Sequence, residues 1–174
     1  MTYLFVLQNV EMNEYIISLG SNQGQSDIIL LQAMKALGEH GAPVTKRSSL
    51  YRTKPWGKTD QADFINAVVS VSWEGKPEEL LHILQDIEHR FHRKRVVHWG
   101  PRTLDLDLIY SKSVSCSSDV LQLPHPYFWQ RLFVLVPLEE IWPDFTYQGT
   151  GIHEQIARLG GYDAVHKIDE RKDS

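Results

Sequence analysis

A near alternation of apolar and polar side chains over residues 64–73 constrains the fold of this chain more than any other feature. The apolar positions 65, 67, 69, 71 and 73 fall on one face of an extended strand, whereas Asn66, Ser70 and Ser72 fall on the other. We therefore expect one face of this strand to pack into a core and the polar face to be exposed. The strand stops at Gly75, and Pro77 suits the first turn of a helix that buries positions 80, 84, 87 and 91.

The segments on either side predict further elements in a recognisable order. Strands are expected over residues 14–20, 44–53 and 102–110, a helix from Ser26 or Asp27 to Gly38 or Gly41, and short helices near 128–136 and 152–159. The order β-α-β-β-α-β predicts a ferredoxin-like α+β fold, an antiparallel sheet with helices packed on it, followed by a C-terminal extension. Residues 1–13 form an N-terminal extension, either an edge strand or a tail, and residues 14–174 form a single domain.

Composition excludes several classes of protein. With 174 residues and 42% hydrophobic side chains, the chain can build one cored domain, and no apolar run approaches the ~20 residues of a membrane span. The N-terminus is a poor secretory signal because no basic residue precedes its short apolar stretch. The single cysteine, Cys116, cannot form an internal disulfide, which fits a reducing cytoplasm. We expect a cytoplasmic monomer that binds neither nucleic acid nor membranes.

The net charge of −4 conceals one basic segment. Residues 88–102 contain five Lys or Arg residues and one acid. A single basic segment in an acidic protein is a poor footprint for general nucleic-acid binding, but it suits a compact polyanion. On charge alone, a solvated helix end is the more usual interpretation of such a segment.

Two aspartates follow this segment on a predicted strand. Because side chains alternate, Asp105 and Asp107 share one face, with Cα atoms roughly 6.6 Å apart, while leucines 104, 106 and 108 pack into the core. Such a pair can bracket one hard divalent ion, or two ions ~3.5–4 Å apart in a phosphoryl-transfer site, although a solvent-facing pair is the simpler alternative. Beside the basic segment, the pair favours magnesium and a nucleoside triphosphate. The chain has no Walker-type or kinase-type glycine-rich loop.

Five motifs in order make this sequence similar to a known family. They are the segments at residues 17–22 (ISLGSN), 49–55 (SLYRTKP), 63–67 (DFINA), 99–107 (WGPRTLDLD) and 124–138 (PHP, then RLFVLVPL from 131). Together they resemble the 6-hydroxymethyl-7,8-dihydropterin pyrophosphokinases of folate biosynthesis, over about residues 15–145. The resemblance implies ATP as co-substrate, two Mg²⁺ ions, and transfer of a pyrophosphoryl group to the hydroxymethyl oxygen of the pterin with release of AMP.

The resemblance also implies roles for individual residues. Asp105 and Asp107 match the metal-binding aspartates, and Arg93, Arg95 and Asp107 are the expected catalytic residues. The expected ATP contacts are Gln85, Glu88, Arg93, Arg95, Arg102, Leu108, His125 and Arg131. The expected pterin contacts are Gly20, Thr53, Lys54, Trp56, Phe64, Asn66, Trp99 and Phe133, with the two phenylalanine rings on either side of the pterin.

Some positions depart from the family pattern. His92 and His98 stand where the family usually has glycine and arginine, which weakens the positive charge of the expected catalytic loop. One alternative is therefore a pterin- or nucleotide-binding module with impaired catalysis. A second alternative, an RNA-binding ferredoxin-like domain, fits less well because the predicted exposed face of residues 64–73 carries small polar side chains rather than aromatic ones.

Overall fold

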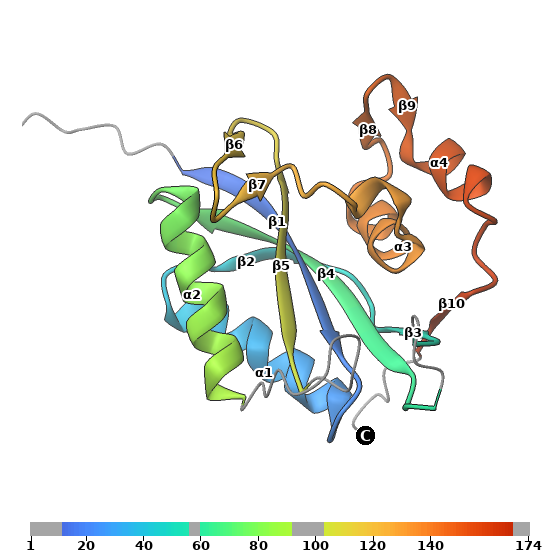
Figure 1. The fold of residues 1–174 in the computed structure, drawn as a ribbon, viewed down its shortest axis with the longest axis horizontal. Coiled ribbons are helices and arrows are strands. Elements are labelled where there is room, and N and C mark those ends of the chain that lie inside the picture. Colours follow the sequence, from blue (N-terminus) through green and yellow to red (C-terminus); the bar gives the residue numbers. More distant parts are fainter. Residues whose placement is uncertain (1–11, 56–59, 92–102, 169–174) are drawn as a thin grey trace, which may run out of the picture.

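The computed structural model describes residues 12–55, 60–91 and 103–168, and the elements in these ranges follow the predicted order (Figure 1). The first half contains β1 (Asn13–Ser21), α1 (Ser26–Glu39), β2 (Val44–Arg47), β3 (Tyr51–Thr53), β4 (Phe64–Trp73), α2 (Pro77–Arg90) and β5 (Asp105–Ser111). The second half contains β6 (Cys116–Ser117), β7 (Gln122–Leu123), the 3₁₀ turn η1 (Phe128–Gln130), α3 (Leu132–Ile141), β8 (Thr146–Tyr147), β9 (Thr150–Gly151), α4 (Ile152–Arg158) and β10 (Val165–Lys167). The ferredoxin-like prediction is confirmed.

The main sheet is antiparallel, with the strand order β10-β3-β4-β1-β5, and β2 also pairs with β4. β1 lies between β4 and β5. β5, which carries the two aspartates, is the last strand of this path. β10 comes from the C-terminal part of the chain and pairs with β3, so residues far apart in sequence meet at the other end of the sheet.

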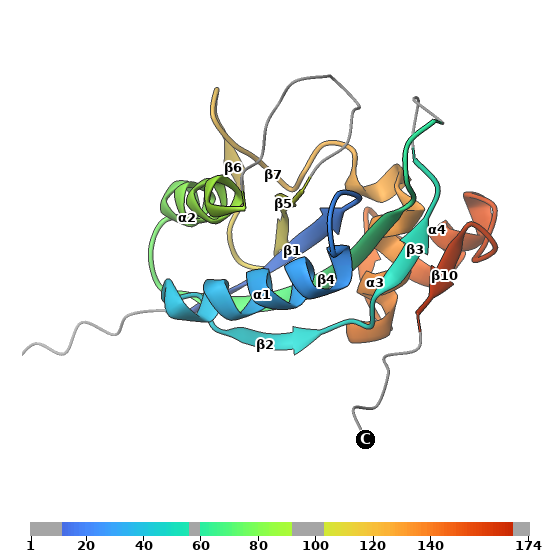
Figure 2. The ribbon, with the colours of Figure 1, turned by 90° about the horizontal axis from the view of Figure 1, so that it is seen from below.

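Helices cover both faces of the sheet (Figure 2). α1 and α2 pack on one face over a core that includes Ile17, Leu30 and Leu84. α3 and α4 form the second core, on the other face, with Val68 and Ile109 of the sheet. The prediction that the polar face of β4 is exposed is therefore wrong. Asn66 is 4% exposed and Ser70 is 1% exposed, because a second layer that the periodicity of one strand cannot reveal covers them.

Local chemistry explains where elements begin and break. α2 starts at Pro77, and the Lys76 backbone N–H donates a 3.0 Å hydrogen bond to Glu79 Oε2, which caps the first turn. The single strand predicted over 44–53 is instead two, β2 and β3. At the break, the Ser48 backbone N–H still donates to Val68 O at 2.9 Å, but the Val68 N–H donates to Ser48 Oγ at 3.0 Å, so a side chain takes one of the two backbone bonds there.

Two other boundaries also differ from the prediction. β5 begins at Asp105 rather than at residue 102, which lies outside the described ranges. The helix predicted near 128–136 is a 3₁₀ turn followed by α3, which continues to Ile141. Within the described ranges, no helix has the length and apolar character to span a membrane.

Candidate active site

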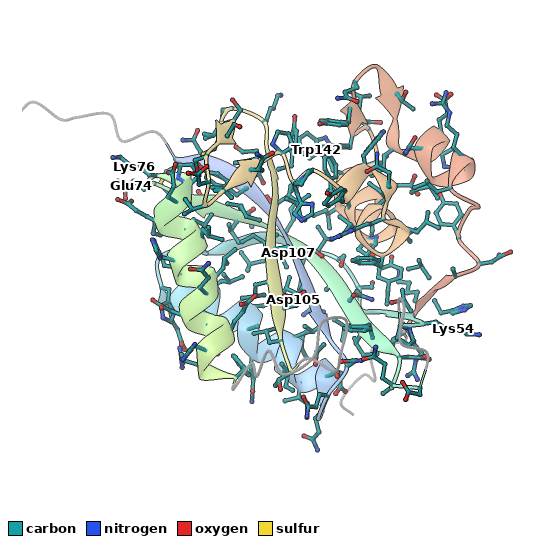
Figure 3. All side chains as sticks on the ribbon, viewed as in Figure 1. Lys54, Glu74, Lys76, Asp105, Asp107 and Trp142 are labelled. Atoms are coloured by element: carbon teal, nitrogen blue, oxygen red, sulfur yellow. The ribbon has the colours of Figure 1, made fainter. Side chains whose placement is uncertain are left out.

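Asp105 and Asp107 lie one after the other along β5, on the face of the sheet that α3 covers (Figure 3). Leu104, Leu106 and Leu108 are buried in the opposite core, as predicted. Both carboxylates are therefore directed away from that core, and both residues are partly exposed. A rigid strand holds them on one side of the sheet, so that they can act together on a cation.

The same face carries a polar row that crosses the sheet from β4 to β5. Gly20 of β1 pairs with Asn66 of β4 on one side and with Asp105 of β5 on the other, and cross-strand partners share a face. Asn66 Nδ2 donates a 2.7 Å hydrogen bond to Thr53 Oγ1 on β3. The row therefore places an amide and a hydroxyl group on the same face as the two carboxylates.

Gly20 keeps this row open. A Cβ atom at position 20 would lie 3.2 Å from Asn66 Oδ1 and 3.9 Å from Phe64 Cδ1. Any side chain at this position would thus press on the amide and the ring of two predicted pterin contacts. The glycine is needed here for space, and its backbone φ is not in the left-handed region.

His125 and Arg131 approach the aspartates from the segment that precedes α3. The His125 backbone N–H donates a 2.8 Å hydrogen bond to Ile109 O, which fixes this segment against β5. Burial, with the positive charge of Arg131, lowers the pKa of His125 from 6.5 to about 4, although the negative charge of Asp105 acts in the opposite direction. His125 Nδ1 accepts the backbone N–H of Tyr127 at 3.1 Å, so the neutral imidazole carries its proton on Nε2.

Arg131 lies between two aromatic rings. Its guanidinium carbon is 5.7 Å from the ring centroid of Tyr127 and 5.7 Å from that of Phe133. Planar guanidinium groups stack on rings and still bind phosphate oxygens along their edges. Arg131 thus joins a predicted phosphate contact to one of the predicted pterin-stacking residues.

A cleft of about 810 Å³ opens beside this face, between the β3 end of the sheet and the start of α3. Four predicted site residues line it: Thr53, Lys54, Arg131 and Phe133. Lys54 lies towards the edge of the sheet opposite to Asp105, beyond β4 (Figure 3). The remaining wall residues are Arg52, Pro55, Asp63, Gln130, Leu132, Leu159, Asp163, Ala164, Val165 and His166.

Motif matching identified none of these remaining wall residues as site residues. Gln130 and Leu132 flank Arg131, so their position next to a predicted contact was the available signal. Residues 163–166 reach the cleft only because β10 pairs with β3, where Val165 lies opposite Thr53. No local pattern in the sequence encodes that pairing, which joins strands more than a hundred residues apart.

Three predicted ATP contacts lie apart from this group. Gln85 is exposed on α2, on the other side of the sheet. Glu88 is 6% exposed, and its Oε1 accepts the backbone N–H of Leu106 at 2.8 Å, so it also ties α2 to β5. Leu108 is 3% exposed in the core under α1 and α2, so its side chain is not available to a nucleotide. The predicted residues Trp56, Arg93, Arg95, Trp99 and Arg102, together with His92 and His98, lie outside the described residues.

The donors present suit magnesium. Asp105 and Asp107 offer only oxygen ligands, and among residues 12–55, 60–91 and 103–168 no cluster of three or more His, Cys, Asp or Glu side chains could hold a metal. Mg²⁺ is usually bound by one or two carboxylates, with water and substrate phosphates completing its shell. A pair of aspartates on one face of a strand fits that pattern.

The fold and this site define an α+β protein with a carboxylate pair on β5 and with His125 and Arg131 on the segment before α3, residue types that can bind phosphates together with a divalent cation. Residues 16–143 match the model of the 7,8-dihydro-6-hydroxymethylpterin-pyrophosphokinase (HPPK) family. The chain belongs to this family.

Named relatives agree with the family match. The chain is 46% identical over 126 residues to the 2-amino-4-hydroxy-6-hydroxymethyldihydropteridine pyrophosphokinase of Bacillus subtilis, covering 72% of this chain and 75% of the relative. It is 40% identical over 149 residues to the protein of the same name from Methylorubrum extorquens, covering 85% and 94%. It is also 34% identical to a folate synthesis bifunctional protein of Arabidopsis thaliana, of which it spans 36%.

Solved structures support the fold. The chain superposes on Plasmodium falciparum HPPK-DHPS, wild type with pteroate, with a TM-score of 0.66 over 85% of this chain. The sequence identity is 14%, and the chain spans 42% of that protein. At this identity the likeness concerns the fold alone.

Proposed function

We propose that this chain transfers the pyrophosphoryl group of ATP to the hydroxymethyl oxygen of 6-hydroxymethyl-7,8-dihydropterin and releases AMP, a step of folate biosynthesis. Membership of the HPPK family supports the reaction. The observation that carries the proposal is the row across one face of the sheet, where Asn66, Gly20 and Asp105 stand side by side on neighbouring strands. Groups suited to a heterocycle and groups suited to a metal-bound phosphate then meet within one site.

The pterin side of the proposed site uses hydrogen bonds and rings. Asn66 Nδ2 is engaged with Thr53 Oγ1, and its Oδ1 can accept an N–H from the amide edge of a pterin. Phe64 and Phe133 are the proposed ring contacts on either side of the substrate, and stacking adds about 0.5–1.5 kcal/mol beyond area burial. Gly20 and Lys54 complete this side, and from the sequence we add Trp56 and Trp99.

The phosphate side uses donors of two kinds. Arg131 supplies a permanent charge, whereas the neutral His125 supplies an Nε2–H donor, since its Nδ1 accepts from Tyr127. We propose that Arg93, Arg95 and Arg102 add further positive charge from the basic segment, and that Gln85, Glu88 and the backbone of Leu108 contribute on the nucleoside side. Donors held in place in this way stabilise the negative charge that develops on the transferred group.

Asp105 and Asp107 are the proposed ligands of two Mg²⁺ ions. When bound, such ions neutralise phosphate charge and align the attacking and leaving oxygens. Asp107 is also the proposed acceptor of the hydroxyl proton, although a loose phosphoryl-transfer transition state asks little of a base. We further propose that the chain acts as a monomer, a state that light scattering of the purified protein measures directly.

The test is AMP release from MgATP with and without 6-hydroxymethyl-7,8-dihydropterin. AMP that forms only when the pterin is present supports the enzyme. Pterin binding without any AMP would instead indicate the impaired binding module. The matched control is Asp107→Asn, which keeps the size of the side chain and removes the charge.

A further inference from the structure

Two consecutive carboxylates near the end of α3 have separate sets of partners. Glu139 accepts the Tyr162 hydroxyl at 2.7 Å and lies 3.4 Å from His153 Nδ1, so its partners belong to α4 and the loop that follows it. Glu140 has partners on the sheet side instead. Neither residue belongs to the proposed catalytic groups.

Glu140 gathers donors from one short stretch of chain. Its two oxygens accept the Ser49 backbone N–H at 3.1 and 3.0 Å, and Oε1 also accepts Ser49 Oγ at 2.7 Å. Oε2 accepts the hydroxyl of Tyr51, and Lys167 Nζ lies 3.7 Å from Oε1. One carboxylate on α3 therefore binds the β2–β3 connection and β3, and it lies within ion-pair distance of Lys167 on β10. Both strands lie beside α3 (Figure 2).

Electrostatics favour the charged form of this carboxylate. Partial burial alone raises the pKa of Glu140, but the hydrogen bonds from Tyr51 and Ser49, with the charge of Lys167, outweigh it and hold the pKa below its usual value. Burial and the neighbouring Glu140 carboxylate raise the pKa of Tyr51, so its hydroxyl remains a donor. The link between α3 and β3 thus persists across the physiological pH range.

The partners of Glu140 lead directly to the pterin side of the site. Tyr51 lies opposite Asn66 in the β3–β4 pairing, and Thr53, two residues further along β3, accepts the Asn66 amide. Phe133 lies in the first turn of α3, the helix that ends just after Glu140. Thr53 of β3 and Phe133 of α3 both line the same cleft.

We infer that Glu140 is a positioning residue for the pterin: it fastens β3 to α3, and so fixes Thr53, with its partner Asn66, relative to Phe133 of α3. This inference rests on the proposed function. Glu140 need not touch the substrate, because it acts through the strand and the helix that it joins. Small errors in the placement of binding groups weaken a site strongly. On the phosphate side, His125 is held against β5 by its own bond to Ile109 O, and the two aspartates belong to β5 itself, so most of that side is fixed independently of Glu140.

The experiment compares Glu140→Gln and Tyr51→Phe with the neighbouring control Glu139→Gln. Glu140→Gln keeps the shape but presents an amide donor to Ser49 and Tyr51, and Tyr51→Phe removes one hydroxyl from the same link. We expect the KM and the calorimetric Kd for 6-hydroxymethyl-7,8-dihydropterin to rise about tenfold in both variants, with the KM for ATP within about twofold of wild type. Glu139→Gln is expected to leave both KM values unchanged.

The outcomes separate the inference from the proposed function. A lower melting temperature with unchanged pterin affinity, or an equal rise in the KM for both substrates, overturns the positioning role. If Glu140→Gln does not fold, Tyr51→Phe decides the question. If the wild-type chain binds the pterin but forms no AMP, the proposed function fails, and the calorimetric Kd values of the variants still decide the role of Glu140.

Discussion

At the scale of single residues, the orientation of Asp105 and Asp107 sets them apart from the core. The leucines that alternate with them are buried under α1 and α2, so the carboxylates contribute little to that packing. We predict that Asp105→Ala and Asp107→Ala each lower turnover by about three orders of magnitude, at about 1.4 kcal/mol of transition-state stabilisation per decade. Steady-state kinetics measure this loss, and circular dichroism is expected to show an intact fold. Near-normal magnesium-dependent activity in either variant would refute the metal site.

His125 gives a prediction that depends on pH. Its pKa is held at about 4 in the folded chain, below the ordinary 6.5, mainly by burial. Between these two values the unfolded chain binds a proton that the folded chain does not, so His125 lowers the free energy of unfolding as the pH falls from 6.5 to 4. His125→Gln, which keeps a donor near the Nε2 position, is expected to lose less stability over that range. Urea unfolding at pH 5 and pH 7 tests this, and an identical pH dependence in both proteins would contradict it.

At Gly20 we predict the effect of adding a side chain where a neighbouring amide leaves little room. A Cβ at this position meets Asn66 Oδ1 at 3.2 Å, so Gly20→Ala must displace the amide by a few tenths of an ångström. We expect the KM for the pterin to rise about fivefold, which corresponds to a loss of about 1 kcal/mol in binding. The matched control is Gly38→Ala on α1, where a Cβ meets nothing within 4 Å. That control is expected to stabilise the chain by about 0.5–1 kcal/mol and to leave kinetics unchanged, as thermal unfolding and steady-state assays will show.

At the scale of elements, the start of α3 brings together proposed contacts for both substrates. Arg131 precedes the helix and Phe133 lies in its first turn, with the guanidinium 5.7 Å from the ring centroid. We predict that Phe133→Ala weakens pterin affinity by roughly 1–3 kcal/mol through lost stacking and apolar contact, and ATP affinity much less. Calorimetric titration with each ligand measures the pterin affinity and the ATP affinity. Equal losses for the two ligands would show that Phe133 serves only the core.

Elements with strong local signals could be predicted from the sequence. β4 has the expected bounds because its alternation is bracketed by turn residues, and α2 starts at the expected Pro77. The shared face of the two aspartates follows from the period of two on β5. Two predictions were wrong. The strand expected over residues 44–53 breaks at Ser48, whose side chain accepts the Val68 N–H, and the polar face of β4 is buried by a layer that the pattern of the strand itself does not indicate.

The parts of the site that depend on distant contacts could not be predicted in this way. The cleft wall at residues 163–166 exists because β10 pairs with β3, and the proximity of His125 to Asp105 depends on how a loop runs along β5. The matched motifs identified His125 and Arg131 as site residues, but only the structure shows that Arg131 lies between Tyr127 and Phe133. Glu140 lies outside every matched motif, although its side chain accepts hydrogen bonds from Ser49 and Tyr51.

At the scale of the whole molecule, the two faces of the sheet serve different purposes. The face under α1 and α2 is an apolar core, whereas the face under α3 combines a second core with the polar end that carries the proposed site. The family match covers residues 16–143, yet the cleft also uses the later residues that form β10. The C-terminal part of the chain is therefore part of the proposed site as well as of the sheet.

The central claim is the transfer of two phosphoryl units together to the pterin. ATP labelled with radioactive phosphorus at the γ position, and separately at the α position, tests it in the presence of magnesium and 6-hydroxymethyl-7,8-dihydropterin. We expect the γ label in the pterin product and the α label in AMP, in equal amounts. A γ label found in inorganic phosphate or in a monophosphorylated pterin, with ADP as the other product, would contradict it.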